Sequence, residues 1–185
     1  SFGLWFADDV VLVDNIRDTL GYDDGIFLRW LLNTLLYVVL GAGGATALAV
    51  LGGYGLAMFD FPGRRAVLAV VLGAVAVPGT ALAVPTFLMF SRIGLTNTPW
   101  AVIIPSCVSP FGVFLGRIYV EASVPDELLE AARLDGASEL RVFFQIVLRL
   151  LAPAMVTIFL FIFVATWNNF LLPLIVLFIT LQRYW

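Results

Sequence analysis

Lysine and histidine are absent from this 185-residue sequence, and cysteine occurs once, as Cys107. The chain therefore holds no His-dependent acid/base triad, no Cys/His metal cluster and no intramolecular disulfide. Charged residues make up only 12% of it, and all ten cations are arginine. They form no basic stripe, so we expect no nucleic-acid partner. The missing lysine also excludes an ATP-binding P-loop, whose Gly-Lys-Ser/Thr ending requires one.

Apolar residues dominate what is present: 62% of the chain is hydrophobic and the mean hydropathy is +1.03. A water-soluble fold cannot hide that much apolar surface, so we expect an integral membrane protein. A helix needs about 20 mainly apolar residues to cross a bilayer. Four stretches qualify, and only the third holds a charge, Arg117 near its end. The predicted fold is all-α and multi-pass, with spans at about 31–59, 66–90, 99–119 and 151–180.

Both ends of the sequence suggest an internal piece of a longer chain. Residue 1 is Ser rather than Met, and residues 181–185 follow directly on an apolar run. The segment 1–28 is acidic and has no signal-peptide pattern. We therefore expect further sequence on both sides.

Arginine distribution predicts the orientation. Four spans put both ends of the chain on one side and the Arg64-Arg65 link and the 120–150 insert on the other. The side of the insert carries six arginines and the opposite side four, namely Arg64, Arg65, Arg117, Arg133, Arg141 and Arg149 against Arg17, Arg29, Arg92 and Arg183. This bias predicts that the insert is cytoplasmic and the 1–28 segment external.

The first span has small residues at every fourth position: Gly41, Ala45, Ala49, Gly53 and Ala57. Residues at this spacing lie on one helix face and allow another helix to approach closely. We therefore expect the face to be a helix-packing surface, although a Gly/Ala-rich composition can produce such a row by chance.

Four prolines interrupt the second and third spans: Pro78, Pro85, Pro105 and Pro110. Each removes a backbone donor, so bent or broken helices are expected there. Such breaks occur in transport pathways and in purely structural membrane helices alike. Cys107 lies between two of these prolines and is interpreted as a small buried apolar residue.

The 120–150 insert predicts two helices joined by a tight turn. Ser123 is the expected N-cap of a helix from Asp126 to Leu134, with Pro125 in its first turn. Gly136 would end this helix in the left-handed conformation. A second helix would run from Ser138 to about residue 150. Its expected apolar face is Leu140, Phe143, Phe144, Val147, Leu148 and Leu151, opposite Arg141, Gln145 and Arg149.

The segment Glu130-Ala131-Ala132-Arg133-Leu134-Asp135-Gly136-Ala137 resembles the EAA signature of permease subunits in binding-protein-dependent ABC importers. Other segments resemble the carbohydrate branch of this family, the maltose-permease inner-subunit type: Asn33-Thr34-Leu35, Phe61-Pro62-Gly63-Arg64, Ile93-Gly94-Leu95-Thr96-Asn97-Thr98 and Trp167-Asn168-Asn169-Phe170. The family usually has a proline where this chain has Arg149, which leaves open whether the chain bends after the second loop helix.

The resemblance implies a six-span, MetI-like permease in a prokaryotic cytoplasmic membrane, with one span missing here at each end. Its implied partners are a second permease subunit, two ATPase subunits, an extracytoplasmic solute-binding protein, a sugar-type solute and membrane lipid. ATP and Mg²⁺ would bind to the ATPase, and this chain would hold no cofactor or metal and catalyse nothing. ATP-driven closure of the ATPase pair would switch the spans by alternating access.

The resemblance assigns ATPase coupling to Glu130, Ala131, Ala132, Asp135, Gly136 and Ala137. Glu130 would present its carboxylate to a basic group of the ATPase, Ala131 and Ala132 would keep the contact flat, and Gly136 would make the turn. The alternative for Glu130 is a solvated residue paired with Arg133, three positions along the helix, which would contribute only ~0.2–0.5 kcal/mol.

Trp167, Asn168 and Asn169 lie inside the last span, where an unpaired amide is costly. We expect bonds between helices or a gating role rather than direct sugar contact, although aromatic faces and amides would also suit a sugar. The predicted function is a sugar or oligosaccharide importer permease. The alternatives are a permease for another small solute, such as a glycerol phosphate or an opine, and a self-contained channel or transporter.

Overall fold

The computed structural model describes residues 12–169 and 171–178, and all of its regular elements there are helical. The chain divides into two units, one ending at Leu36 and one starting at Tyr37. The described part of the first unit contains α1 (Leu12–Gly21), η1 (Tyr22–Gly25) and the beginning of α2 (Ile26–Met58).

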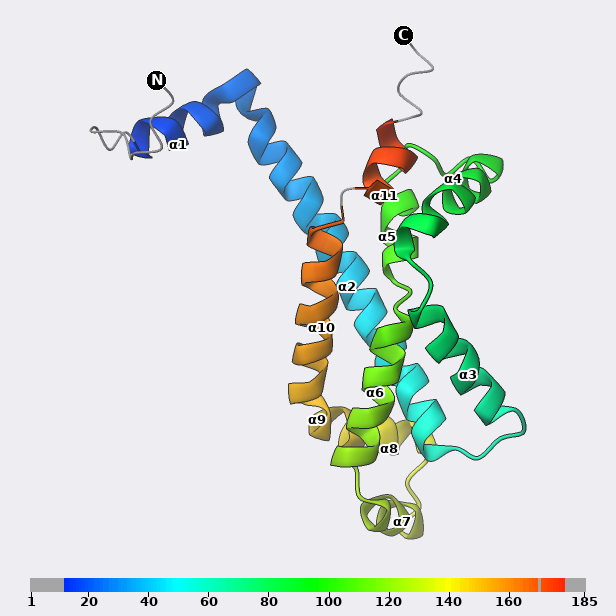
Figure 1. The fold of residues 1–185 in the computed structure, drawn as a ribbon. Helices are drawn as coiled ribbons and strands as arrows, with labels where there is room; N and C mark the ends of the chain where they lie inside the picture. The colour runs from blue at the N-terminus through cyan, green and yellow to red at the C-terminus, as the bar shows by residue number, and fades with distance from the viewer. Residues whose placement is uncertain (1–11, 170, 179–185) are drawn as a thin grey trace, which may run out of the picture. The chain divides into compact units, whose positions relative to one another are not determined.

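The second unit contains the rest of α2 and a series of shorter helices (Figure 1). They are α3 (Arg64–Val75), η2 (Gly79–Leu82), α4 (Ala83–Arg92), α5 (Trp100–Ser106), α6 (Pro110–Ser123), α7 (Asp126–Leu134), α8 (Glu139–Val142), the π-helix η3 (Phe143–Val147), α9 (Leu148–Leu150), α10 (Ala152–Trp167), α11 (Leu171–Pro173) and the π-helix η4 (Leu174–Phe178).

Two helical segments are long and apolar enough to cross a membrane: Ile26–Met58 and Trp100–Ser123. Two further candidates are bent pairs, Arg64–Val75 with Gly79–Arg92 at 97° and Glu139–Leu150 with Ala152–Trp167 at 75°. The described chain thus holds two candidate spans, or up to four if each bent pair crosses as one.

The second predicted span is broken rather than continuous. Helix α3 ends at Val75, and Pro78 precedes the short η2 turn in an extended conformation, with ψ of 128°. Proline has no N–H to continue the helix, which explains the break at this point. A bend also follows the loop helices, although Arg149 stands where the resemblance predicts a proline. Pro153 lies in the first turn of α10 beyond it.

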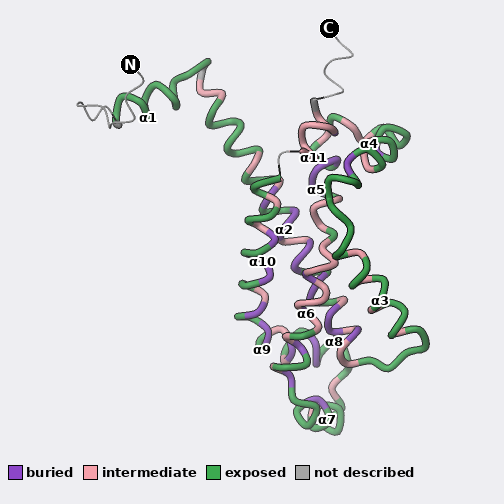
Figure 2. The backbone as a smooth tube through the Cα atoms, in the orientation of Figure 1, coloured by how far each residue is buried: buried purple, intermediate pink, exposed green. Residues whose placement is uncertain are grey.

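The core of the second unit forms two clusters of buried side chains. Figure 2 marks the buried residues along the backbone. The larger one joins α2, α6 and α10 to the segment 124–151, through residues such as Val50, Val120 and Ile158. The smaller one joins α4, α5 and η4 around Phe90, Ala101 and Val176. The segment that carries the signature therefore shares the main core of the helix bundle.

The side chain of Arg64 caps the C-terminal end of α2. Its Nε donates to the carbonyl of Leu56 at 2.8 Å and its Nη2 to that of Ala57 at 3.1 Å. Its Nη1 pairs with Asp60 at 2.6 Å. A cation at a helix C-terminus satisfies free carbonyls and interacts favourably with the helix dipole. The same guanidinium lies 4.0 Å from Glu121 of α6.

The α2–α3 link and α7 therefore lie at the same end of the second unit, and α4, which carries Arg92, lies at the other (Figure 1). Within the second unit, this agrees with the predicted orientation, which places the Arg64-Arg65 link and the 120–150 insert on one side and Arg92 on the other. Which side of a membrane each end faces stays a prediction.

Candidate functional site

Helix α7 has the bounds that the sequence predicts, Asp126–Leu134, with Asp126 and Glu127 in its first turn. The predicted N-cap is wrong, because Ser123 is the last residue of α6 and Pro125 precedes α7 without a side-chain cap. Helix α6 continues past the predicted end of the third span to Ser123, and the extended backbone at Val124 and Pro125 then separates the two helices.

Gly136 ends α7 in a Schellman motif. The N–H of Ala137 donates to the carbonyl of Ala132 at 3.0 Å, and the N–H of Gly136 to that of Arg133 at 3.0 Å. Gly136 has a φ of +78°, which confirms the predicted left-handed turn. A Cβ at this position would meet no atom within 4 Å. The requirement for glycine is therefore set by the backbone conformation and not by space.

An ion pair closes the hairpin formed by residues 126–142, which we call the α7–α8 hairpin. Arg133 Nε lies 2.7 Å from Glu139 Oε1, and Nη2 lies 3.4 Å from Oε2. The hydrogen bond and the negative charge of Glu139 raise the pKa of Arg133 above its ordinary value. The suggested pairing of Arg133 with Glu130 is therefore replaced by one with Glu139, because the turn brings α8 opposite the guanidinium.

Leu129 anchors the α7–α8 hairpin to the bundle, since its side chain is only 2% exposed within the main core. Ala132 and Ala137 are half-buried and pack against the same core. On the other side of the turn, Val142 and Phe143 are buried. The hairpin therefore contacts the helix bundle through side chains from both of its arms.

The outer face of the hairpin carries the rest of the predicted coupling residues. Glu130, Ala131, Asp135 and Gly136 are exposed, whereas Ala132 and Ala137 face the bundle. The structure thus divides the predicted set into an outer group of four and an inner group of two.

Large apolar side chains lie exposed beside this outer group, and sequence reasoning missed them as surface residues. Leu134 is 89% exposed, Leu140 72% and Phe144 61%. Leu140 and Phe144 were expected on one apolar face together with Phe143 and Val147. Phe143 and Val147 are buried, whereas Leu140 in α8 and Phe144 in the π-helix η3 are exposed. Exposed apolar residues among charged ones are typical of a protein-binding surface.

The small-residue face of α2 is buried, as predicted for Gly41, Ala45, Ala49 and Gly53. Its partners are on the third span. A Cβ on Gly53 would lie 2.5 Å from the backbone N of Arg117. The backbones of α2 and α6 are therefore in direct contact.

The matching small residues on α6 are Gly112 and Gly116, which sequence reasoning missed. A Cβ on Gly116 would lie 2.6 Å from the carbonyl oxygen of Ala49, and one on Gly112 would lie 3.1 Å from the Ala49 Cβ. Their Gly-x-x-x-Gly spacing is the signal that could have identified them in the sequence.

Trp167, Asn168 and Asn169 form a break between α10 and α11. Trp167 ends α10 and stacks on Phe163, with ring centroids 5.8 Å apart and an interplanar angle of 16°. Asn168 Nδ2 donates to the carbonyl of Val164 at 2.9 Å, and Asn169 Oδ1 accepts from the N–H of Leu172 at 3.3 Å. Both amides thus bond to nearby backbone. Asn169 takes an N–H at the start of α11, whereas the carbonyl of Val164 also keeps its helical bond from the N–H of Asn168, at 3.1 Å. The expected bonds across helices are not among these contacts.

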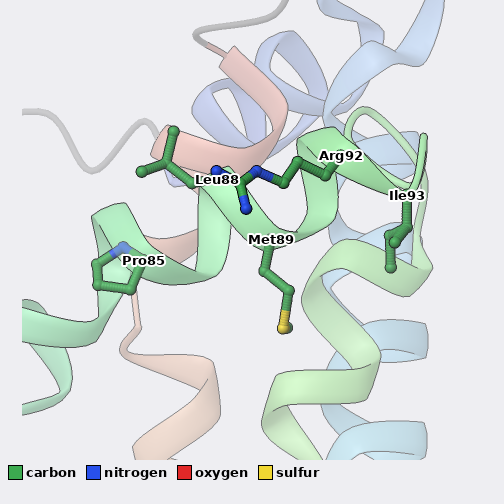
Figure 3. Close-up of a pocket in the computed structure, with 5 residues that line it drawn as sticks. All are labelled: Pro85, Leu88, Met89, Arg92 and Ile93. Atoms are coloured by element: carbon green, nitrogen blue, oxygen red, sulfur yellow. The ribbon is translucent and has the colours of Figure 1, made fainter.

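A hollow of about 360 Å³ lies along one face of α4 (Figure 3). Met89 and Ile93 extend in the same direction there, and the Arg92 side chain runs back along the helix toward Leu88. Pro85 completes the lining. The hollow is mainly apolar, contains none of the predicted site residues, and offers Arg92 as its charged group. In the described part of the chain, no group of three or more His, Cys, Asp or Glu residues could hold a metal ion.

Comparison with known proteins gives consistent matches. The family model described as "Binding-protein-dependent transport system inner membrane component" matches residues 45–183. The chain is 35% identical over 153 residues to the arabinooligosaccharides transport system permease protein AraQ of Halalkalibacterium halodurans, a match that covers 83% of this chain and 54% of that protein. It is 34% identical over 166 residues to the lactose transport system permease protein LacG of Rhizobium radiobacter, covering 90% and 60%.

Among solved structures, the chain is similar to one from a bacterial ABC transporter involved in the import of the acidic polysaccharide alginate. The TM-score is 0.69 at 26% identity, and the match covers 82% of this chain and 56% of that one. The chain spans about half the length of the curated relatives it matches.

Proposed function

Because the chain belongs to the family of binding-protein-dependent transport system inner membrane components, we propose that it is a permease subunit of an ATP-driven ABC importer for a sugar or oligosaccharide. Membership confirms the predicted location in the inner membrane. The names of the relatives, which refer to arabinooligosaccharides and lactose, support a carbohydrate solute. The alginate importer, whose solute is also a carbohydrate, supports the same class.

The exposed outer face of the α7–α8 hairpin is the observation that carries the proposal. Glu130 and Asp135 offer negative charge there, and Leu134 offers an apolar side chain that is 89% exposed. A partner with a basic group and an apolar cleft would complement this surface. On the proposed function, that partner is a cytoplasmic ATPase subunit, and the hairpin end of the bundle faces the cytoplasm.

The attachment of the hairpin explains how movement of the ATPase would reach the spans. Only Val124 and Pro125 separate α7 from α6, and Leu129 is buried in the core shared with α2 and α10. A shift of α7 therefore cannot leave the bundle unchanged. Because α2 and α6 touch at Gly53, we expect the two helices to move together as one body during alternating access.

The remaining parts of the importer would lie on other chains. A second permease subunit would complete the pore, two ATPase subunits would bind and hydrolyse ATP with Mg²⁺, and an external solute-binding protein would deliver the sugar. This chain would conduct the solute and catalyse nothing, since it has no lysine with which to form a P-loop.

Trp167, Asn168 and Asn169 are proposed as a gating hinge rather than as sugar ligands. Both amides are engaged with backbone at the break between α10 and α11. A helix interrupted there can change direction, because Asn169 accepts the N–H of Leu172 in place of a helical carbonyl. Replacement of these residues should therefore alter transport rate more than solute preference.

The test is co-purification. The tagged full-length protein is extracted from its native membrane in mild detergent, and the co-purifying chains are identified by mass spectrometry. We expect an ATPase and a second permease with the wild type. With the double variant Glu130→Ala, Gly136→Val, we expect the ATPase to be lost and the second permease retained.

The matched control is Glu127→Ala, which removes an exposed carboxylate from the first turn of the same helix and leaves the outer face of the turn intact. It should retain the ATPase. A protein that purifies alone, or a double variant that retains its ATPase at the wild-type level, contradicts the proposed coupling surface.

A further inference from the structure

The segment 139–150 leads from the turn of the α7–α8 hairpin to α10, which opens the fourth predicted span. It contains α8, η3 and α9, and the chain bends by 75° between this segment and α10. Its helices lie at the same end of the second unit as α7 (Figure 1). A helix at such a steep angle to a membrane-spanning neighbour lies close to the plane of the membrane. The 139–150 segment therefore has the orientation of a helix at a membrane surface.

One face of this segment is buried in the main core. Val142, Phe143 and Val147 belong to that core and hold the segment against the helix bundle. Because this packing fixes the rotation of the segment, Leu140 and Phe144 are held on the outside, where both are exposed. Two large apolar side chains are thus kept away from the core by the burial of their neighbours.

Two arginines accompany these apolar side chains. Arg141 and Arg149 are exposed, and Arg141 Nε donates to Gln145 Oε1 at 3.0 Å. The ion pairs formed among the described residues use other arginines, so no carboxylate of this part of the chain neutralises Arg141 or Arg149. The outside of the segment therefore combines apolar side chains with uncompensated positive charge.

The other arm of the loop carries charge of the opposite sign. Helix α7 and its turn expose four carboxylates: Asp126, Glu127, Glu130 and Asp135. The arginine of this helix, Arg133, is paired with Glu139. A basic partner that complements these carboxylates would repel Arg141 and Arg149. The two arms therefore require partners of different chemistry.

An anionic phospholipid surface matches the 139–150 segment in both charge and polarity. A guanidinium forms strong charge-assisted hydrogen bonds with phosphate oxygens. In helices that lie on a membrane, leucine and phenylalanine enter the boundary between headgroups and acyl chains, while arginines stay at the level of the headgroups. Exposed leucine and phenylalanine beside unpaired arginines are the side chains that such a surface requires.

We propose that the 139–150 segment is a membrane-surface element that binds anionic phospholipid. Arg141 and Arg149 bind lipid phosphates, and Leu140 and Phe144 enter the apolar boundary beneath them. This inference goes beyond the proposed function, because the ATPase would dock on the acidic arm. With its inner face in the core and its outer face in the lipid, the segment would fix the depth of the bundle and leave α7 in water.

The test measures what touches residue 144 in the assembled complex. A bimane fluorophore is attached to Phe144→Cys in the full-length chain, with Cys107 and every other cysteine of the complex replaced by serine. The complex is reconstituted into vesicles of phosphatidylethanolamine and phosphatidylglycerol, one of which carries a nitroxide quencher on its acyl chain. The matched control is Leu134→Cys, an exposed apolar position on the acidic arm. We expect quenching at residue 144 and little at residue 134.

The role of the arginines is tested by exchanging the lipid that carries the quencher. Phosphatidylglycerol should be enriched at residue 144 by about fivefold for each arginine. The double variant Arg141→Gln, Arg149→Gln should abolish this preference. The charge-matched variant Arg65→Gln, Arg92→Gln, which changes two exposed arginines outside the segment, should retain it.

Three outcomes would overturn the inference. They are an unquenched label at residue 144, which would mean that protein covers it, equal quenching by the two lipids in the wild type, and a preference that survives in the Arg141→Gln, Arg149→Gln variant. A chain that purifies without an ATPase would instead refute the proposed function. The quenching measurement can still be made on that chain alone, so the two failures are distinguishable.

Discussion

The contact between α2 and α6 makes a quantitative prediction at Gly53. A Cβ there would lie 2.5 Å from the Arg117 N and from the Gly116 carbonyl carbon, about 0.9 Å short of the 3.4 Å at which ordinary contact begins. The obstructing atoms belong to the backbone and cannot rotate away, so the helices must separate. Overpacking of this kind costs about 1–3 kcal/mol.

The matched control is Gly55→Ala, because a Cβ on Gly55, two residues along the same helix, would meet nothing within 4 Å. Both variants replace a helical glycine by alanine, so the gain in helix propensity, up to about 1 kcal/mol, cancels in the comparison. Gly53→Ala should therefore be about 1–3 kcal/mol less stable than Gly55→Ala. For a domain of this size, that difference lowers the unfolding midpoint by roughly 2–12 °C.

The assay is thermal unfolding of each purified variant in the same detergent, followed by the loss of a monodisperse peak on size exclusion. If Gly53→Ala unfolds at or above the unfolding temperature of Gly55→Ala, the inference that the backbones of α2 and α6 are in direct contact at Gly53 is wrong.

Two further predictions concern the ends of helices. Gly136→Val forces a β-branched residue into a φ of +78°, which should destabilise the turn by about 1–2 kcal/mol. The variant should reduce solute uptake more than its abundance in the membrane. Normal uptake at normal abundance would rule out the turn as a coupling element. Arg64→Ala removes the donors to the Leu56 and Ala57 carbonyls and should lower the free energy of unfolding by about 1–3 kcal/mol. Arg65→Ala, at the exposed neighbouring residue, should change it little. Equal shifts of the thermal unfolding midpoint in the two variants would exclude a specific helix cap.

Local features of the fold could be read from the sequence. Helix α7 and its glycine turn follow from the acidic first turn and from Asp135-Gly136, because capping depends on residues within a few positions of each other. The breaks near Pro78 and Pro110 follow from the missing backbone donors. The family follows from the signature segment, and the family match confirms it.

Where one helix begins only a few residues after another ends, the local sequence led to wrong predictions of the helix boundary and of the buried side chains. Serine is a residue type typical of an N-cap, yet Ser123 belongs to α6, because this helix continues past the predicted end of the third span. Leu140 and Phe144 were assigned with Phe143 and Val147 to one apolar face by the regular helical period. The structure buries only part of that face, and a π-helix, η3, occupies residues 143–147, which nothing in the local composition indicates.

The sequence by itself determined that this chain is a helical membrane protein, that one face of the helix in its first apolar stretch packs closely, and that a hairpin with a glycine turn lies between its third and fourth apolar stretches. These properties depend on composition and on short-range sterics and hydrogen bonding. Only the tertiary structure decided which groups meet: Gly53 with α6, Arg133 with Glu139, and Tyr54 with Phe143. Such pairings depend on the direction in which each helix leaves its turn, and that direction is set by the packing of the whole core.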